Sequence, residues 1–304
     1  MAEIAGLDPR HLYDRVRLNT YTILAEGGYL DRVSKRGSDL ERWRRYLEKI
    51  GRPEQPPPTN LLAQPTIFPM MEDLPTMAWR DAKLIAASAI LEKMFPVIRA
   101  EIDAADVSKF IRYESIILAG GKWAVMPVYV FGADTCKVLY KHNPFPETSR
   151  ILQELPGACP MLPLADAAFS AHGPHTRLIP HCSWDPFRLR LHLGLHIPGN
   201  CGIRVGTETR YWSEGKVLAF HDSFEHETYN DSGETRIVLI VDLWHPDLTP
   251  IERQAILGCF RKKEIRRALM QTRAPSELQP VFDSEFLAAE ANDPLLAEYW
   301  NYQA

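Results

Sequence analysis

Two histidines stand where the chain could bring them together on a metal ion. His181 closes the short apolar segment that begins at Arg177, and His226 follows directly after a strand-like segment that ends near Asp222. Imidazoles on different strands can meet inside a barrel, and imidazole binds iron, copper, zinc and nickel alike. The common oxygenase site adds an Asp or Glu two residues after the first histidine, but Ser183 occupies that position. These residues alone leave an oxygenase metal site, a catalytic zinc site and no metal as alternatives.

Arg236 is a charged residue in a segment that is otherwise typical of a buried strand. It opens the segment 235–244, which is apolar on both faces. A guanidinium there requires an anion, because an unpaired buried charge is costly. A ligand carboxylate would fit, since a guanidinium can bind both of its oxygens. The alternative is a salt bridge within the protein, for which the candidates are Glu234, Asp222 and Asp242.

The segment 188–196 alternates without interruption between leucine and polar residues. One face carries Arg188, Arg190, His192, Gly194 and His196, and the other face carries four leucines. A surface strand with its polar face in water would show the same pattern. If the polar face instead lines a pocket, its cationic residues favour an anionic substrate.

The elements that would position these residues are mostly β-strands. The expected strands cover 122–131, 165–172, 177–182, 188–197, 201–212, 216–222 and 235–244. So many strands with few helices between them indicate a sandwich or barrel rather than alternating strands and helices. Helical spacing appears in 7–50, from Trp79 to about Ala105 with a kink or break at Pro96, and from Thr249 to about Arg273.

The chain divides at a proline-rich stretch. We expect a helical N-terminal module with its linker at 1–58, a catalytic domain at 59–273 and a peripheral tail at 274–304. Within the first module, Leu40, Trp43, Leu47 and Ile50 share one face of a helix.

Composition excludes several classes of function. A net charge of -4 and a pI near 6.2 disfavour sequence-independent nucleic-acid binding, which needs a concentrated basic surface. No apolar run is long enough to span a bilayer, and no signal sequence is apparent, so we expect a cytoplasmic protein that does not bind membranes. The five cysteines are dispersed, as expected for reduced structural thiols.

Five motifs in order along the chain resemble the aspartyl/asparaginyl β-hydroxylase family. The matching segments are 180–183, 188–195, 208–217, 222–227 and 236–250. The resemblance implies a mainly β fold with flanking helices, whose core is a double-stranded β-helix (a cupin-like jelly roll). It also implies iron(II) bound by two histidines without a protein carboxylate, with 2-oxoglutarate and O2 as co-substrates. The serine at position 183 agrees with this family.

The resemblance also implies roles for individual residues. His181 and His226 would bind iron, and Ser170, His192 and Arg236 would hold the distal carboxylate of 2-oxoglutarate. Asp222 would orient a metal-bound water, while Arg190, with Arg188 on the same face, would meet the substrate. The segment 181–187 departs from the family's glycine-bearing loop, which disfavours a folded extracellular substrate.

We therefore expect a dioxygenase that hydroxylates an unactivated C–H bond of a small carboxylate-bearing or peptide-like substrate. Halogenation, desaturation or cyclisation at the same iron is an alternative, and a non-enzymatic cupin-like protein that binds carboxylates is another. The oligomeric state is left open and includes a homodimer. We place His172 and His175 in loops, His221 pointing away from the metal, and Trp184 and Trp212 in packing or pocket walls.

Overall fold

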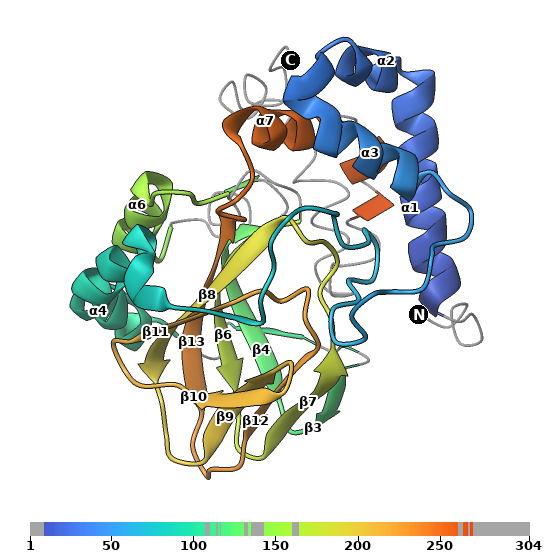
Figure 1. Cartoon of the computed structure of the whole chain (residues 1–304). Helices are drawn as coiled ribbons and strands as arrows, with labels where there is room; N and C mark the ends of the chain where they lie inside the picture. Colours follow the sequence, from blue (N-terminus) through green and yellow to red (C-terminus); the bar gives the residue numbers. More distant parts are fainter. Residues whose placement is uncertain are drawn as a thin grey trace.

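Two antiparallel β-sheets make up the lower part of the molecule, with helices above and beside them (Figure 1). The computed structural model describes residues 9–106, 110–113, 115, 117–130, 133–134, 143–159, 164–260, 264–266 and 268–269. Phe220 and Val238 from one sheet share a core with Ile203 and Val205 from the other. The sheets therefore face each other, and the fold is the predicted cupin-like jelly roll.

The larger sheet contains the strands with the charged residues. Its order is β1 (Trp79–Arg80), β11 (Val217–Phe220), β8 (Arg188–His196), β13 (Arg236–Trp244), β6 (Asp166–His172), β4 (Trp123–Val130) and β2 (Ile111–Arg112), and β5 (Ala133–Asp134) pairs with β4. The smaller sheet runs β10 (Glu208–Tyr211), β9 (Cys201–Val205), β12 (His226–Asn230), β7 (Thr176–His181) and β3 (Leu118–Gly120). Strands β8 and β13 are neighbours in the middle of the larger sheet.

The leucine face of β8 is buried against helices, so its polar face must point between the sheets. Leu189, Leu191, Leu193 and Leu195 share a core with residues of α4 (Ala86–Ala104) and α6 (Pro146–Glu154). The alternation of side chains then directs Arg188, Arg190 and His192 to the interior of the barrel. The surface-strand alternative is therefore wrong.

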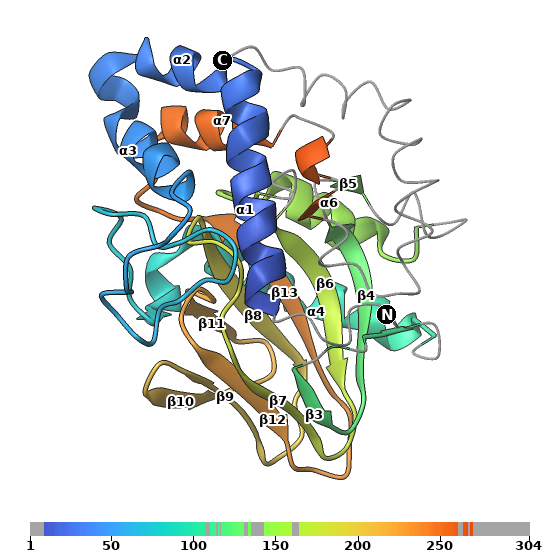
Figure 2. The ribbon, with the colours of Figure 1, turned by 90° about the vertical axis from the view of Figure 1, so that its right-hand side faces the viewer.

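The N-terminal helices pack on the top of the barrel beside α7 (Pro250–Cys259), as two views at right angles show (Figures 1 and 2). They are α1 (Pro9–Glu26), α2 (Tyr29–Ser34), the 3-10 helix Gly37–Leu40 and α3 (Glu41–Ile50). The predicted face with Leu40, Trp43, Leu47 and Ile50 is buried in a core that also contains Phe187. Phe187 lies in the loop before β8, so this core supports the entry to the central strand.

Most expected elements are confirmed, with informative differences. Strand β12 was not predicted, and the expected strand 201–212 is a hairpin that turns at Gly206, where φ is 60°. Trp79 lies in a strand rather than a helix, and α4 begins after the short 3-10 helix Ala82–Leu84 and continues through Pro96. Leu84, the last residue of that 3-10 helix, is 85% exposed.

The end of the chain is only partly described. Thr249 caps α7 through a reciprocal pair of hydrogen bonds with Glu252, as its sequence predicted. The helix ends at Cys259 rather than continuing unbroken toward Arg273. Residues 270–304, which include the expected tail, lie outside the described residues.

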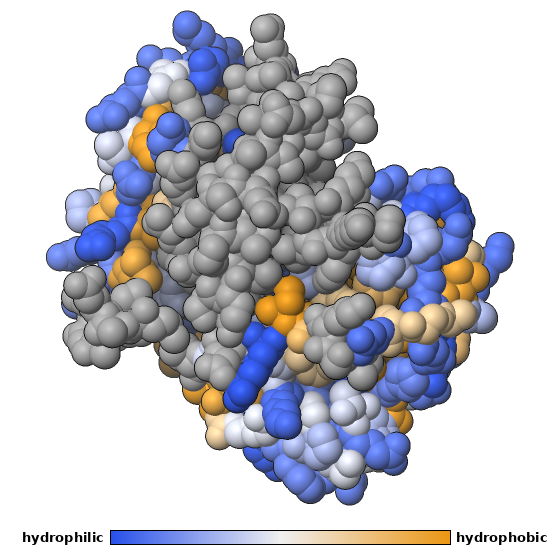
Figure 3. Space-filling model, turned by 180° about the vertical axis from the view of Figure 1, so that it is seen from behind, coloured by the Kyte–Doolittle hydropathy of each residue, from blue (hydrophilic) through white to orange (hydrophobic). Residues whose placement is uncertain are grey.

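In the view from behind, the hydrophobic residues that are not drawn in grey lie in several groups among hydrophilic ones (Figure 3). Large exposed hydrophobic side chains are Leu61, Met77, Leu84, Ile179 and Tyr211. Within the described ranges, none of the helices is both long and apolar enough to cross a membrane.

Candidate metal and carboxylate site

The two predicted metal ligands are directly opposite each other in the smaller sheet. His181 ends β7, His226 begins β12, and the two are partners in the antiparallel ladder. Their ring centroids are 4.2 Å apart. Nδ1 of His181 lies 2.7 Å from the carbonyl of Ile179, and Nδ1 of His226 lies 2.8 Å from that of Phe224. Since each Nδ1 must donate its proton to a carbonyl, each Nε2 carries a free lone pair.

Burial keeps both imidazoles neutral. Burial, and after it the neighbouring His181, lower the pKa of His226 to about 3. Burial also lowers the pKa of His181. A neutral imidazole is the form that binds metal, so the pair is prepared for a cation at neutral pH.

Ser183 does not face the histidines as a third ligand would. Its Oγ accepts a hydrogen bond from Arg188 at 2.8 Å, and its backbone N–H donates to the carbonyl of Asp222 at 2.8 Å. In the part of the chain that the structure describes, no group of three His, Cys, Asp or Glu side chains could hold a metal ion.

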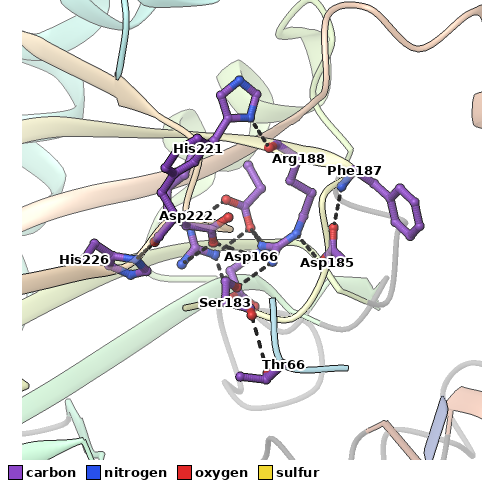
Figure 4. A network of polar contacts seen from close by, with 12 residues as sticks. Thr66, Asp166, Ser183, Asp185, Phe187, Arg188, His221, Asp222 and His226 are labelled. Atoms are coloured by element: carbon purple, nitrogen blue, oxygen red, sulfur yellow. Dashed lines mark hydrogen bonds and ion pairs between the residues drawn. The ribbon is translucent and has the colours of Figure 1, made fainter. Parts of the chain in front are cut away.

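Asp222 lies beside His226 and carries a negative charge (Figure 4). Its side chain is fully buried, and its Oδ2 is 3.1 Å from Nη1 of Arg190 and 3.5 Å from Nη2 of Arg188. Burial raises the pKa of Asp222, but the two guanidinium groups lower it by more. The guanidinium groups are close but poorly aligned, so neither oxygen accepts a hydrogen bond from a described residue.

Arg188 is held inside a cluster of carboxylates (Figure 4). Its Nε donates to Asp185 at 2.8 Å, and its Nη1 donates to Asp242 at 2.5 Å. The Arg188 side chain has no exposed surface. Because its nitrogens bind protein oxygens and it is shielded from solvent, Arg188 is placed out of reach of a substrate.

Arg190 belongs to the same cluster but remains 13% exposed. Its Nε and Nη2 donate to the two oxygens of Asp242 at 2.7 and 2.8 Å, and Nη2 is 3.3 Å from Asp166. His196 turns elsewhere and pairs with Asp103 at 2.6 Å. The cationic face expected from the sequence is thus largely neutralised by aspartates.

Arg236 has a different environment. It is 1% exposed, its Nε has no hydrogen-bond partner, and its Nη1 reaches the carbonyl of Ser170 only at 3.4 Å. Among the described residues no carboxylate pairs with it, so the salt bridge to Glu234, Asp222 or Asp242 is not formed. Burial lowers the pKa of Arg236 to about 9, which leaves it charged at neutral pH.

His192 and Ser170 lie near this unpaired charge. Both ring nitrogens of His192 are buried and have no hydrogen bond with a described residue. Burial lowers the pKa of His192 well below its usual range, and the charges of Arg190 and Arg236 act in the same direction. Ser170 is 2% exposed and accepts a hydrogen bond from the indole of Trp123 at 3.1 Å. The three residues predicted to hold a carboxylate therefore come from adjacent strands of the larger sheet.

Trp212, which the sequence left as a packing or pocket-wall residue, is a further member of this group. Arg236 lies 4.6 Å from the centre of its ring, and His192 stacks on it with centroids 6.1 Å apart. A Cβ at Gly194 would lie 2.3 Å from the carbonyl oxygen of Ser213, so only glycine permits this segment to approach β8. In the sequence, the glycine within the alternating segment 188–196 was the available sign that another segment packs closely on this strand.

Three other histidines correct or refine the expectations. His172 is the last residue of β6 and 2% exposed, not a loop residue. His175, with φ of 54°, does lie in the turn after it. Nδ1 of His221 lies 3.1 Å from the carbonyl of Arg188, and Nε2 accepts from Arg80 at 3.2 Å, so its nitrogens are occupied away from the metal pair.

Comparison with known proteins agrees with this geometry. The sequence profile described as aspartyl/asparaginyl beta-hydroxylase matches residues 92–246. The chain belongs to this family. The matched region contains the two histidines, the aspartate cluster, and Arg236 with its neighbours His192 and Ser170.

Named relatives share parts of their length with this chain. The aspartyl/asparaginyl beta-hydroxylase of Homo sapiens is 42% identical over 123 residues, which are 40% of this chain and 14% of that protein. The one from Mus musculus is 51% identical over 89 residues, 29% of this chain and 12% of that protein. The aspartate beta-hydroxylase domain-containing protein 2 of Xenopus tropicalis is 32% identical over 212 residues, 66% of this chain and 55% of that protein. The chain thus matches from about an eighth to about half of these relatives' length.

Proposed function

We propose that this protein is an iron(II)- and 2-oxoglutarate-dependent dioxygenase that hydroxylates an unactivated C–H bond of a small carboxylate-bearing or peptide-like substrate. Membership of a hydroxylase family supports the class of reaction. The observation that carries the proposal is the combination of two neutral histidines with free Nε2 atoms and a buried guanidinium without an anion. The histidine pair suits a metal ion, and the unpaired guanidinium suits a carboxylate.

The donor set fits iron(II) better than a structural metal. Two imidazoles leave most coordination positions of an octahedral ion for other ligands, whereas structural zinc is usually enclosed by four protein ligands. Asp222 offers two buried oxygens with no hydrogen-bond donor, so it can accept from a water that occupies the missing carboxylate's position. Ser183, bonded to Arg188, leaves that position clear.

The residues around Arg236 fit 2-oxoglutarate. Arg236 can bind both oxygens of the distal carboxylate, and His192 and Ser170 can contribute further hydrogen bonds. Burial of these residues makes the charge interaction stronger than it would be in water. When bound, iron and 2-oxoglutarate supply the oxidising chemistry with O2, and the protein supplies position.

The protein's residues would then act by orientation and exclusion of water. The backbone hydrogen bonds of His181 and His226 fix both rings, and Phe220 packs edge-on against His192 with centroids 4.9 Å apart. Arg190, which keeps exposed surface, is the residue proposed to meet the substrate. Arg188 is proposed to hold Asp222 and Asp242 in place rather than to touch substrate.

The direct test is anaerobic titration of the metal-free protein with iron(II) and 2-oxoglutarate. We expect visible charge-transfer absorption, and formation of succinate after oxygen and a suitable acceptor are added. A His226→Ala variant should show neither signal, while His175→Asn, altered in the exposed turn, should behave as the wild type. Absence of both signals from the wild type with every acceptor tested would contradict the proposal.

The same assay separates the alternatives. Because Ser183 stands where a carboxylate ligand is common, room is left for chloride, so product mass is compared with and without chloride to detect halogenation. A mass two units lower than the substrate would indicate desaturation or cyclisation. Binding of 2-oxoglutarate that does not depend on metal, without turnover, would indicate a carboxylate-binding protein instead.

A further inference from the structure

Five buried nitrogen atoms that have no hydrogen-bond partner among the described residues lie around Arg236. They are Nε of Arg236, both ring nitrogens of His192, Nε1 of Trp212 and Nδ1 of His172. Buried polar groups in proteins are nearly always hydrogen-bonded, so such a group of exceptions indicates a ligand with several acceptor atoms. A carboxylate offers about four acceptor positions. His172 is the member to which neither the sequence nor the proposed function gives a role.

The position of His172 places its ring beside Arg236. The two residues are direct partners in the ladder between β6 and β13, and Trp123 is the partner of His172 on the other side. Side chains of directly opposed residues lie on the same face of a sheet and contact each other. Ser170, two residues earlier in β6, shares this face and also lies beside Arg236.

The backbone of His172 is firmly held. The side-chain amide of Asn230, which is fully buried, donates to the carbonyls of His172, Gly173 and Glu234 at 3.0, 3.0 and 2.8 Å. These bonds connect the end of β6 to β12 and to the start of β13. The backbone that carries the imidazole is therefore held in place, while Nδ1 of the ring has no hydrogen-bond partner among the described residues.

The charge around His172 favours an anion. Burial, Arg236 and His192 lower its pKa well below the usual range, so the ring is neutral at neutral pH. A neutral imidazole has one N–H to donate. Arg236 supplies the positive charge, and among the described residues no carboxylate competes for either group.

We propose that His172 is a further binding residue for 2-oxoglutarate, donating a hydrogen bond from Nδ1 to the distal carboxylate beside Arg236. This inference rests on the proposed function. It enlarges the carboxylate site from the three residues Ser170, His192 and Arg236 to a ring of donors from β6, β8 and β13. Trp212 closes this ring beneath the guanidinium.

A purely structural role is the competing account of His172. The ring packs edge-on against Trp123 with centroids 6.1 Å apart, as an ordinary core residue would. The two accounts differ in what a leucine at this position does. A core role predicts a less stable protein with unchanged ligand affinity, and a binding role predicts the reverse.

The experiment compares His172→Leu, His172→Asn and the control His175→Asn. Affinity is measured by calorimetry with manganese(II) in place of iron, so that no turnover occurs. Two ligands are used: 2-oxoglutarate, and 2-oxopentanoate, in which a methyl group replaces the distal carboxylate. Thermal unfolding of each ligand-free variant reports stability.

We expect His172→Leu to weaken 2-oxoglutarate binding roughly tenfold or more, the usual effect of losing a hydrogen bond to a charged group. Binding of 2-oxopentanoate should change less than about twofold, and unfolding should occur at the same or a higher temperature, because an unsatisfied buried polar group is removed. His172→Asn, whose amide can donate from a position near Nδ1, should recover part of the loss.

Equal affinity of the wild type and His172→Leu for 2-oxoglutarate would overturn the inference and leave the proposed function intact. Equal losses for both ligands would also overturn it, because the effect would not depend on the distal carboxylate. If the wild type itself binds no 2-oxoglutarate, the proposed function fails, and the inference fails with it.

Discussion

Arg188 and Arg236 occupy neighbouring strands of the same sheet and are each 1% exposed, yet their surroundings are opposite. Arg188 contacts Asp185 and Asp242, and Asp222 lies close by. Arg236 has an indole face, two imidazoles and no described carboxylate. Burial of a cation therefore does not by itself indicate a ligand site. A buried cation indicates such a site only where no protein anion pairs with it.

The difference has an energetic meaning. In the aspartate cluster, three fully buried carboxylates surround Arg188 and Arg190, so the arginines are required to compensate negative charge. Around Arg236, the guanidinium itself is uncompensated and reduces the stability of the ligand-free protein. The first region contributes to folding, and we propose that the second contributes to binding.

The largest effect is expected from Arg188→Met, which removes the charge and keeps much of the volume. Asp185 and Asp242 would remain buried without their partner, so the free energy of unfolding should fall by about 3–5 kcal/mol. Urea denaturation measures this change. A loss below about 1 kcal/mol would mean that the cluster is worth no more than a surface pair.

The same substitution at Arg236 should affect ligand affinity instead. Arg236→Met is expected to weaken 2-oxoglutarate binding by roughly thirtyfold or more, which corresponds to about 2 kcal/mol or more. The free energy of unfolding should stay equal or rise, because no carboxylate loses its partner. Destabilisation comparable to that of Arg188→Met would show that the two regions do not differ as described.

Acidification should destabilise the ligand-free protein through its unpaired histidines. Burial lowers the pKa of His226 from 6.5 to about 3, so the unfolded chain binds more protons than the folded chain below pH 6.5. The free energy of unfolding should then fall by about 2 kcal/mol between pH 7 and pH 5 from this residue alone.

The aspartates act in a lower range. The pKa values of Asp222 and Asp242 are lowered from 3.8, so the stability that they provide is lost only as the pH falls through and below that value. Denaturation measured at several pH values separates the two contributions. A constant free energy of unfolding from pH 7 to pH 5 would contradict the burial of neutral histidines.

The smallest effect is expected at an exposed arginine of the smaller sheet. Arg177 on β7 pairs with Asp231 at 2.7 Å, but the two side chains are 60% and 41% exposed. Arg177→Met should change the free energy of unfolding by less than about 1 kcal/mol and leave 2-oxoglutarate affinity unchanged. A larger effect would show that the substitution to Met is itself disruptive, which would weaken the conclusions drawn from Arg188 and Arg236.

Local pattern was sufficient to predict the parts of the fold that depend on alternation. The alternation of 188–196 predicted strand β8, and the doubly apolar segment 235–244 predicted a buried strand at β13. The sequence left open whether the arginine of β13 pairs with a protein carboxylate or with a ligand. Strand β12 was missed because the sequence His226–Asn230 shows no alternation of apolar and polar residues. Every second residue is buried, but the buried residues His226, Thr228 and Asn230 are themselves polar. His172 was assigned to a loop although the expected strand 165–172 included it, and the structure places it at the end of β6.

The aspartate cluster could not be predicted because its pairs are distant in sequence. Asp242 is 54 residues from Arg188, and the two meet only because β8 and β13 are neighbours with that register. Glu234, Asp222 and Asp242 were equal candidates for Arg236 until the register was known. The choice between a paired and an unpaired arginine therefore depends on strand order, which a single sequence does not show.

The ladder position of His181 and His226 has a consequence for the mechanical stability of the smaller sheet. Since the two residues are opposed partners at the ends of β7 and β12, an ion bound by both would act as a crosslink between strands that are remote in the chain. Like a disulfide, such a link restricts the unfolded chain more than the folded one. Unlike a disulfide, it could be removed by a chelator, so the cohesion of these strands would depend on the supply of metal.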